Sequence, residues 1–415
     1  YTLKSIIDYF KESLPTPRQL GVTASTGCAA VLIGGSTLHS FMYVGLAKRE
    51  ANDLLSTLRR KHNPRYQELK ELQVLIIDEI SMIDAALFEK ISEYMSLIKK
   101  DPRPFGGVQV VLVGDFYQLP PVKGDYCFES SVWPRLNLET AELVVQVRQA
   151  GDPTFQTLLT EIREGVVTPE TMSILSNCMG NKLDKKIKYT KLYPKNVDVD
   201  RINKHFMEKL MEKYGHTSHT FQNELKGTVD ICIGCQVMIT RNLATECGII
   251  NGTRGVVETI DKGSSVVIIR LCSGNSFEVD MVDLLDDDDV IIATIMPLKL
   301  AWATTIHKSQ GATIDKLDID LGGDIFAYGQ AYTALSRAVS LDGLRIKAVL
   351  RRSFKTDPKV KQFYDDMKWT HASQTPMSIQ PPEPPIPVAA PEVKIETEPE
   401  APEPPSPIPV AAPDA

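Results

Sequence analysis

The chain has 415 residues and a mass of 46.1 kDa, with 43% hydrophobic and 24% charged residues, a composition typical of a soluble globular protein with two or three domains. No apolar run reaches the roughly 18 residues of a membrane span, no secretory signal is visible, and seven scattered cysteines indicate free thiols in a reducing compartment. Residues 371–415 carry −6 of the net charge of −7, so the nearly neutral body neither predicts nor excludes a nucleic-acid partner. We expect an intracellular protein with no membrane partner.

The first 145 residues alternate between helix-like and strand-like segments. The opening segment 1–14 has apolar residues at helical spacing and no capping residue before it, as in a helix cut near its beginning. Strand-like stretches follow in "RQLGVTAST", "VLIIDE" and "VQVVLVGD", separated by helical patterns around 48–60 and over about 82–99. This alternation predicts a parallel sheet covered by helices.

The stretch "VLIIDEIS" (74–81) runs from four apolar residues into two carboxylates, Asp78 and Glu79. A run without alternation is typical of a strand buried on both faces of a parallel sheet. Its carboxyl end is where open α/β sheets bind ligands. Asp is also a good N-cap, so Asp78 either faces a ligand or caps the helix that follows. The stretch alone leaves both interpretations open.

The remaining chain predicts a second α/β unit over 146–227 and 284–355, with "VIIATI" and "KLDIDL" as its later strands. Between them, over 228–283, short strands separated by Gly, Asn and Ser turns predict an inserted small β-barrel. A C-terminal helix is expected over 356–370. Residues 371–415 hold 14 of the 27 prolines and predict a disordered tail, which either docks a protein partner or is only solvated.

Three further segments carry candidate ligand-binding side chains. "VQVVLVGDFYQLPPV" ends a buried strand in a polar loop, where Gln118 is placed to touch a phosphate at the sheet edge. "TTIHKSQGAT" gathers a His, a Lys, a Ser and a Gln in one loop, over 307–310. "QAYTALSRAVS" places Arg337 on an apolar helical stretch. A buried Arg needs an anion, and either a nucleotide phosphate or a core carboxylate would serve.

Taken in order, these segments resemble the motifs of superfamily 1 DNA helicases of the petite-integration-frequency (Pif) and RecD-like type, over residues 1 to about 355. "TASTGCAAVLIGGSTLHSF" is similar to motif Ia, "LIIDEISMID" to Walker B, "VVLVGDFYQLPPV" to motif III and "VRQAGDPTFQTLLTEIREG" to motif IV. "GCQVMITRNL" and "GIINGTRGVV" resemble segments around the family's inserted barrel. "LAWATTIHKSQGATIDKLDIDL" and "YGQAYTALSRAVSLDGL" resemble motifs V and VI.

The resemblance implies an α/β fold of two RecA-like parallel-sheet lobes, the first one incomplete, with ATP and Mg²⁺ between them. It also implies an ATP-dependent 5′-to-3′ DNA helicase that acts in replication, repair, recombination or telomere maintenance. Glu79 would orient the attacking water and Asp78 would hold Mg²⁺ through its water shell. Gln118, Arg148 and Arg337 would contact the γ-phosphate, with the two arginines stabilising the charge of the transition state.

The same resemblance implies a track for single-stranded DNA across both lobes, and contact with duplex junctions. Gly311 would let the backbone approach the nucleotide or the strand. The strand-binding residues implied are Ser25, Thr26, His39, Phe41, His307, Lys308, Ser309, Gln330 and Tyr332. Hydroxyls, amides and a few rings suit binding that tolerates any base sequence.

One departure concerns the family's Walker A loop, GxxxxGK[ST], because no Gly-Lys-Ser or Gly-Lys-Thr occurs in the 415 residues. Either the sequence is a fragment that begins after this loop, which we expect from Tyr1 and the otherwise complete motifs, or the protein no longer hydrolyses ATP. A fragment would be inactive alone. The alternative functions are a non-hydrolysing DNA-binding or scaffold protein and an RNA-directed motor. A eukaryotic DNA helicase is expected in the nucleus or the mitochondrion.

Two further patterns are interpreted as structural. Cys232-Ile-Gly-Cys235 has the spacing of a metal site, but no second Cys or His pair accompanies it, so we expect no zinc there. The acidic run Asp286–Asp289 is expected to be a solvated turn.

Overall fold

The computed structural model describes residues 2–45, 47–60, 64–181, 189–215, 217–223, 227–241, 243–244, 247, 249, 253–261, 263, 265–271, 274–285, 291–314 and 316–367. The Pro-rich segment 371–415 and the acidic run 286–289 lie outside these residues. No described helix combines the length and the hydropathy that crossing a membrane requires.

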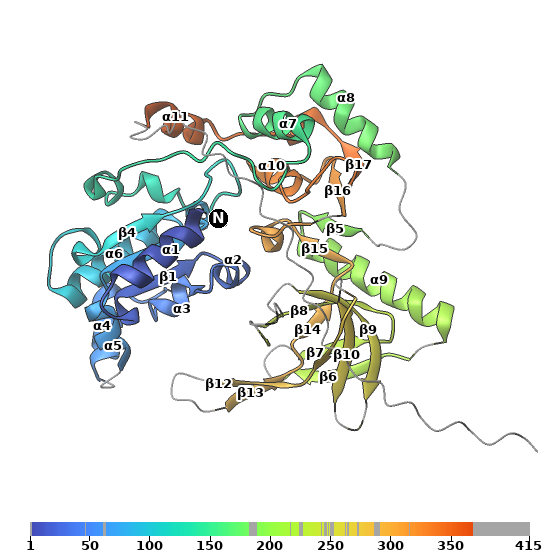
Figure 1. Ribbon diagram of the computed structural model, residues 1–415, viewed down its shortest axis with the longest axis horizontal. Coiled ribbons are helices and arrows are strands. Elements are labelled where there is room, and N and C mark those ends of the chain that lie inside the picture. The colour runs from blue at the N-terminus through green and yellow to red at the C-terminus, as the bar shows by residue number, and fades with distance from the viewer. Residues whose placement is uncertain are drawn as a thin grey trace, which may run out of the picture. The chain divides into compact units, whose positions relative to one another are not determined.

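The N-terminal part is built on a parallel sheet with the strand order β2-β1-β3-β4, drawn in blue and cyan in Figure 1. Its strands are β1 (Leu20–Ala24), β2 (Ser36–Thr37), β3 (Val74–Asp78) and β4 (Gln109–Leu112). The helices around it are α1 (Thr2–Ser13), α2 (Gly27–Leu32), α3 (Leu38–Phe41), α4 (Ala51–Arg60), α5 (Pro64–Glu71) and α6 (Ala85–Lys99). The strands and helices predicted for this part of the chain are confirmed.

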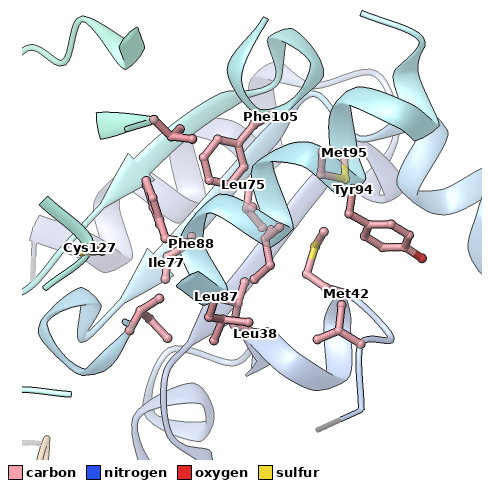
Figure 2. Packing of buried hydrophobic residues seen from close by; sticks show 14 of the residues in the cluster. Leu38, Met42, Leu75, Ile77, Leu87, Phe88, Tyr94, Met95, Phe105 and Cys127 are labelled. Atoms are coloured by element: carbon pink, nitrogen blue, oxygen red, sulfur yellow. The ribbon is translucent and has the colours of Figure 1, made fainter. Parts of the chain in front are cut away.

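Strand β3 is buried on both faces, as its uninterrupted apolar run predicts. Val74 and Ile76 pack against Ile7 of α1 on one face. Leu75 and Ile77 point to the other face, where they join a larger core with the helices α3 to α6. Figure 2 shows this core, in which Leu75 and Ile77 lie among Leu38, Met42, Leu87, Phe88, Met95 and Phe105. Burying one such side chain contributes about 1.5–3 kcal/mol, so this strand is a rigid support for the residues that follow it.

A second parallel sheet has the order β15-β5-β16-β17. Its strands are β5 (Thr190–Tyr193), β15 (Ala303–Thr305), β16 (Leu317–Leu321) and β17 (Leu344–Val349). The helices of this region are α7 (Pro153–Arg163), α8 (Pro169–Asn177), α9 (Asn196–Tyr214) and α10 (Gln330–Leu335). The two parallel sheets with their helices confirm the predicted α/β fold class.

Antiparallel strands occupy the region between β5 and β15 in sequence. Five of them form a sheet of order β11-β10-β9-β8-β14, and two separate pairs are β6-β7 and β12-β13. The bounds are β6 (His219–Asn223), β7 (Gly227–Ile231), β8 (Gln236–Ile239), β9 (Arg254–Asp261), β10 (Val266–Leu271), β11 (Ser276–Val279), β12 (Val282–Leu285), β13 (Ile291–Ile295) and β14 (Leu298–Leu300). Antiparallel pairing therefore extends to Leu300, past the predicted boundary at 283, and the division into domains stays a prediction.

The assignment of "VIIATI" to the second parallel sheet is wrong. Within this stretch, Ile291–Ile295 form β13, which pairs antiparallel with β12, and Val290 lies outside the described residues. Ile291 at the start of the strand is 57% exposed, while Ala293 and Ile295 are buried. Four of the five residues of β13 are apolar, so composition did not separate this strand from one buried in a parallel sheet.

The last described helix, α11 (Pro358–Asp366), packs against the first sheet's core rather than the second's. Val360 is fully buried in that core, and the ring of Phe363 stacks on Phe128 with centroids 4.2 Å apart. Tyr364 stacks on Tyr117 at 4.8 Å, and its hydroxyl accepts a hydrogen bond from the Phe116 amide at 3.0 Å. The chain therefore returns to its first sheet after completing its second.

Candidate active site

The carboxylates Asp78 and Glu79 stand at the carboxyl end of β3, at the edge where parallel strands present ligand-binding residues. The side chain of Asp78 accepts a hydrogen bond from the Glu79 amide at 2.9 Å and caps no helix. The cap of α6 is Asp84, which accepts from the Leu87 amide at 2.8 Å. The interpretation of Asp78 as a helix cap is therefore wrong, and its carboxylate is left to meet a ligand.

Burial and the neighbouring charge of Glu79 together raise the pKa of Asp78 to about 6. A carboxylate in this position lacks a positive partner. A divalent cation would supply one, so the chemistry of the pair fits Mg²⁺ held at Asp78. The backbone at Glu79 is left-handed, with φ 53° and ψ 45°, which turns the chain sharply away from the strand.

The loop after β4 carries Gln118, whose Oε1 accepts a hydrogen bond from Nη2 of Arg337 at 3.1 Å. Arg337 lies in the turn directly after α10. Its contact with Gln118 joins residues that are 219 positions apart. Gly329 makes this approach feasible. A Cβ atom at Gly329 would lie 2.2 Å from the carbonyl oxygen of Gln118, and its φ of +65° also favours glycine.

Arg148 and Arg337 are two guanidinium groups without carboxylate partners among the described residues. Arg337 is 2% exposed, and its nitrogens donate to the Thr333 carbonyl, to the Ser336 hydroxyl and to Gln118. Arg148 donates to the Thr313 hydroxyl at 3.0 Å and to the Ser336 carbonyl at 2.8 Å. Burial and the charge of Arg148 together lower the pKa of Arg337 to about 10, and the charge of Glu79 opposes this shift. Neither arginine forms an ion pair with a carboxylate of the described residues, so both guanidinium groups can still bind an anion.

Glu79 is contacted from the second sheet's region by Gln310, whose Nε2 donates to Glu79 Oε2 at 2.8 Å. Gln310 follows the short helical turn His307–Ser309. The next residue, Gly311, has a φ of +79°, and a Cβ atom there would lie at ordinary contact distance from Ala29 of α2. The turn therefore reaches the first sheet's carboxyl edge at two neighbouring positions.

Several predicted strand-binding residues lie at the ends of strands or on short helices. Ser25 follows β1, and its amide donates to the Asp78 carbonyl at 3.1 Å, while its hydroxyl is buried without a partner. The Thr26 hydroxyl accepts a hydrogen bond from the Ala29 amide at 3.2 Å, at the N-terminal end of α2. Lys308 is exposed and donates to Asn196 at 3.2 Å. Burial lowers the pKa of both His39 and His307, which favours neutral rings.

Two other predicted strand-binding residues are buried. Ser309 is 2% exposed and donates to the Ile306 carbonyl. Gln330 is fully buried; its Oε1 accepts from the Phe326 and Ala327 amides, and its Nε2 has no partner within the described residues. The assignment of these two residues to a strand track is therefore corrected. Tyr332 is half-buried and its hydroxyl donates to Asp115 at 3.2 Å, so its assignment stays a prediction.

Two contacts at the site could not be predicted from the sequence. Gln310 was named only as part of its loop, yet it touches Glu79. Asp115, three residues before Gln118, forms an ion pair with Arg163 of α7 at 3.0 Å. It also accepts a hydrogen bond from the Tyr332 hydroxyl. In the sequence, Gln310 and Arg163 are visible as polar residues in these motifs. Neither position indicates which distant residue it contacts.

Cys232 and Cys235 are buried in the turn between β7 and β8, with sulfur atoms 3.2 Å apart. No group of three His, Cys, Asp or Glu side chains that could hold a metal ion is found within the described ranges.

Comparison with known proteins gives consistent matches. A family model described as PIF1-like helicase matches residues 1–172. The human ATP-dependent DNA helicase PIF1 is 37% identical over 390 residues, which cover 89% of this chain and 59% of that protein. The Bdellovibrio bacteriovorus ATP-dependent DNA helicase Pif1 is 35% identical over 369 residues, covering 84% of this chain and 82% of that protein. The chain spans about 60% of the length of the vertebrate relatives it matches.

Solved structures agree with these matches. The Pif1 helicase of Candida albicans has a TM-score of 0.77 and 32% identity, covering 88% of this chain and 92% of that one. The Bacteroides Pif1 in complex with ADP-AlF3 and ssDNA has a TM-score of 0.64 and 27% identity, covering 87% of this chain and 90% of that one. Sequence and fold thus agree over most of the chain, which belongs to the PIF1-like helicase family.

Proposed function

We propose that this chain is the motor part of an ATP-dependent helicase that moves 5′ to 3′ on single-stranded DNA and unwinds duplex ahead of it. One observation carries the proposal. Arg148 and Arg337 have no ion-pair partner among the described residues; Arg337 donates to Gln118, and the charge of Glu79 at the end of β3 raises the pKa of both arginines. Such a site suits a nucleoside triphosphate, whose phosphates accept from guanidinium groups and whose cation binds carboxylates.

In this proposal Glu79 accepts the proton of the water that attacks the γ-phosphate, and Gln118 contacts the same phosphate. Arg148 and Arg337 stabilise the charge that develops there. Asp78 would hold Mg²⁺ through bound water, and that ion would neutralise phosphate charge during transfer. Because the carboxylates and the arginines come from different sheets, hydrolysis and release would change how the two RecA-like lobes close.

The strand track we propose uses exposed or half-buried groups on both sides of the site. They are Ser25, Thr26, His39 and Phe41 from the first sheet's region and His307 and Lys308 from the second. The similarity to a relative whose structure holds ssDNA supports this track. Alternating grip on the two sides would give directional stepping. The motor would act in a compartment that contains DNA, which in a eukaryote is the nucleus or the mitochondrion. The tail, residues 371–415, would dock a protein partner.

The assay protein has to carry a phosphate-binding loop, because the 415 residues contain no Gly-Lys-Ser or Gly-Lys-Thr. We therefore define the loop-extended chain as residues 1–415 joined at the N-terminus to a segment with a GxxxxGK[ST] loop. Its ATP turnover is measured with no oligonucleotide, with single-stranded DNA and with RNA of the same sequence. Its unwinding is measured on duplexes with either a 5′ or a 3′ single-stranded tail.

DNA-stimulated turnover with unwinding from the 5′ tail alone is the expected result. Stimulation by RNA but not DNA would replace the proposal with an RNA motor. Strand binding without any turnover in the loop-extended chain would support a non-hydrolysing DNA-binding protein and refute the proposal.

A further inference from the structure

Gln310 joins the two halves of the candidate active site through one side chain. It is 1% exposed, and its Nε2 donates to Glu79 Oε2 at 2.8 Å. A carboxylate without a proton only accepts hydrogen bonds, so the carboxamide has to turn its NH₂ group toward Glu79. Its oxygen then faces away from that carboxylate. The orientation of Gln310 is thus set by its partner.

The other end of the same carboxamide has no partner. Oε1 of Gln310 is buried and accepts no hydrogen bond within the described ranges. Buried carboxamide oxygens are nearly always satisfied, and an exception at a functional site points to a missing donor. A water molecule beside Glu79 is such a donor. Hydrolysis needs a water at this place, since Glu79 is the only described group here that is assigned to receive its proton.

The turn that carries Gln310 is well fixed. The Ser309 amide and hydroxyl both donate to the Ile306 carbonyl, and the Gln310 amide donates to the His307 carbonyl. Ile306 is buried at the end of β15. Lys308 of the same turn is exposed and belongs to the proposed strand track. A shift of this turn on strand binding would therefore move Gln310 relative to Glu79.

We propose that Gln310 is a second water-orienting catalytic residue: its Nε2 fixes Glu79 and its Oε1 accepts a hydrogen bond from the attacking water. This inference rests on the proposed function. In the step, the water oxygen bonds to the γ-phosphorus as the bond to the β–γ bridging oxygen breaks, and the water's proton goes to Glu79. ADP and phosphate leave, and Gln310 itself neither gains nor loses a proton. A glutamine that orients the attacking water has precedent in other nucleotide hydrolases.

The first test measures ATP turnover of the loop-extended chain with single-stranded DNA present. Gln310→Ala should lower kcat about 100-fold, as expected for a misplaced nucleophile, while the affinity for a fluorescent ATP analogue stays within about twofold. The matched control is Gln236→Ala in β8. Gln236 also has a buried carboxamide oxygen without a partner, but it lies in the antiparallel sheet. Its kcat should not change.

A second variant gives a result that a purely structural role would not produce. Gln310→Glu keeps the shape and places a carboxylate against Glu79. The charged groups that already face Glu79 are Asp78 from β3, Arg148 from the segment before α7 and Arg337 after α10. Gln310→Glu keeps oxygen atoms that can accept from the water but loses the NH₂ donor to Glu79 and adds a like charge beside it, so kcat should fall while the affinity for the fluorescent ATP analogue stays within about twofold.

The contact itself is tested in the 415-residue chain without any extension. In Gln310→Lys, a carbodiimide should form an amide between the new amine and Glu79, detected by peptide mass spectrometry. The same variant with Glu79→Gln should not form it. Absence of the cross-link overturns the contact.

The turnover results separate the two proposals. If Gln310→Ala retains wild-type kcat while Glu79→Gln loses turnover, Gln310 does not orient water and the proposed function stands. If Gln310→Ala unfolds in a thermal melt, Gln310→Glu decides, and wild-type kcat in that variant overturns the role. If the 415-residue chain with Gln310→Lys forms the cross-link but the loop-extended chain without substitutions shows no DNA-stimulated turnover, the proposed function is refuted, and the role of Gln310 with it.

Discussion

Replacing Asp78 with Asn should make the chain more stable in the absence of nucleotide. The pKa of Asp78 is about 6 in the folded chain against an ordinary value of 3.8, because the carboxylate is buried beside Glu79. The difference of about 2 pKa units corresponds to about 3 kcal/mol. Asn keeps an oxygen for the Glu79 amide, which lies at 2.9 Å, and removes the charge.

The sign of the effect depends on pH. A carboxyl group whose pKa is raised on folding destabilises the folded state when it is ionised. This penalty is absent below the unfolded pKa of 3.8, grows as pH rises from there to about 6, and is constant above that value. Asp78→Asn should therefore raise the free energy of unfolding by about 3 kcal/mol at pH 7.5 and by about half as much at pH 5.

Urea unfolding followed by fluorescence measures this difference. Trp133 packs against Phe88 and Phe116 near the first sheet and reports that part of the chain. The two other tryptophans are replaced by Phe in the reference protein, so that only Trp133 is seen. Asp8→Asn on exposed α1 is the control and should change stability by less than about 0.5 kcal/mol. If Asp78→Asn is no more stable than the reference at pH 7.5, or if its advantage is equal at pH 5, the reasoning is wrong.

Four further outcomes follow from the site. In the loop-extended chain, Glu79→Gln should lower turnover about 10²–10⁴-fold with nucleotide and DNA binding nearly intact; wild-type turnover would contradict its role. Arg337→Ala should lower turnover roughly 10³-fold or more. The melting temperature should change little, because no described carboxylate loses an ion-pair partner. A large drop in melting temperature would instead indicate a structural ion pair. Asp115→Asn should cost about 2 kcal/mol of stability, since it leaves Arg163 half-buried without its partner, and urea unfolding checks this. The 415-residue chain should hydrolyse ATP negligibly but bind single-stranded DNA. The logarithm of its binding constant should fall with the logarithm of salt concentration, with a slope of about −0.7 per phosphate contact. Deleting 371–415, which carries a charge of −6, should not weaken this binding in a fluorescence anisotropy titration.

Strands with a strong local signal could be predicted from the sequence. The four apolar residues before Asp78 form a strand buried on both faces, and "KLDIDL" forms β16 in the second parallel sheet. The apolar pattern did not predict the correct sheet for β13, because apolar residues there do not all mean buried side chains. In β13 nearly every residue is apolar, but Ile291 is mostly exposed, and only the partner strand β12 determines that the pairing is antiparallel.

The chemistry of the site was predictable where a residue type is costly without a ligand. A lone Arg on an apolar stretch indicated an anion, and Arg337 has no carboxylate partner among the described residues. Residues whose role depends on a distant partner could not be found this way. Gln310 and Glu79 are 231 positions apart, and a neutral carboxamide gives no charge signal of its own. Gln330 failed for the converse reason, because its side chain is fully buried and its Oε1 accepts from the Phe326 amide.

The return of α11 to the first sheet has a consequence for how the protein is made. Phe116 and Tyr364 touch although 248 positions separate them. At synthesis rates of about 5–20 residues per second, Tyr364 is added roughly 12–50 s after Phe116. During this interval Phe116, Phe128 and Trp133 lack the rings that later cover them. A nascent first lobe therefore exposes an aromatic surface to solvent, and chaperone binding to ribosome-bound chains should be strongest between these two points of synthesis.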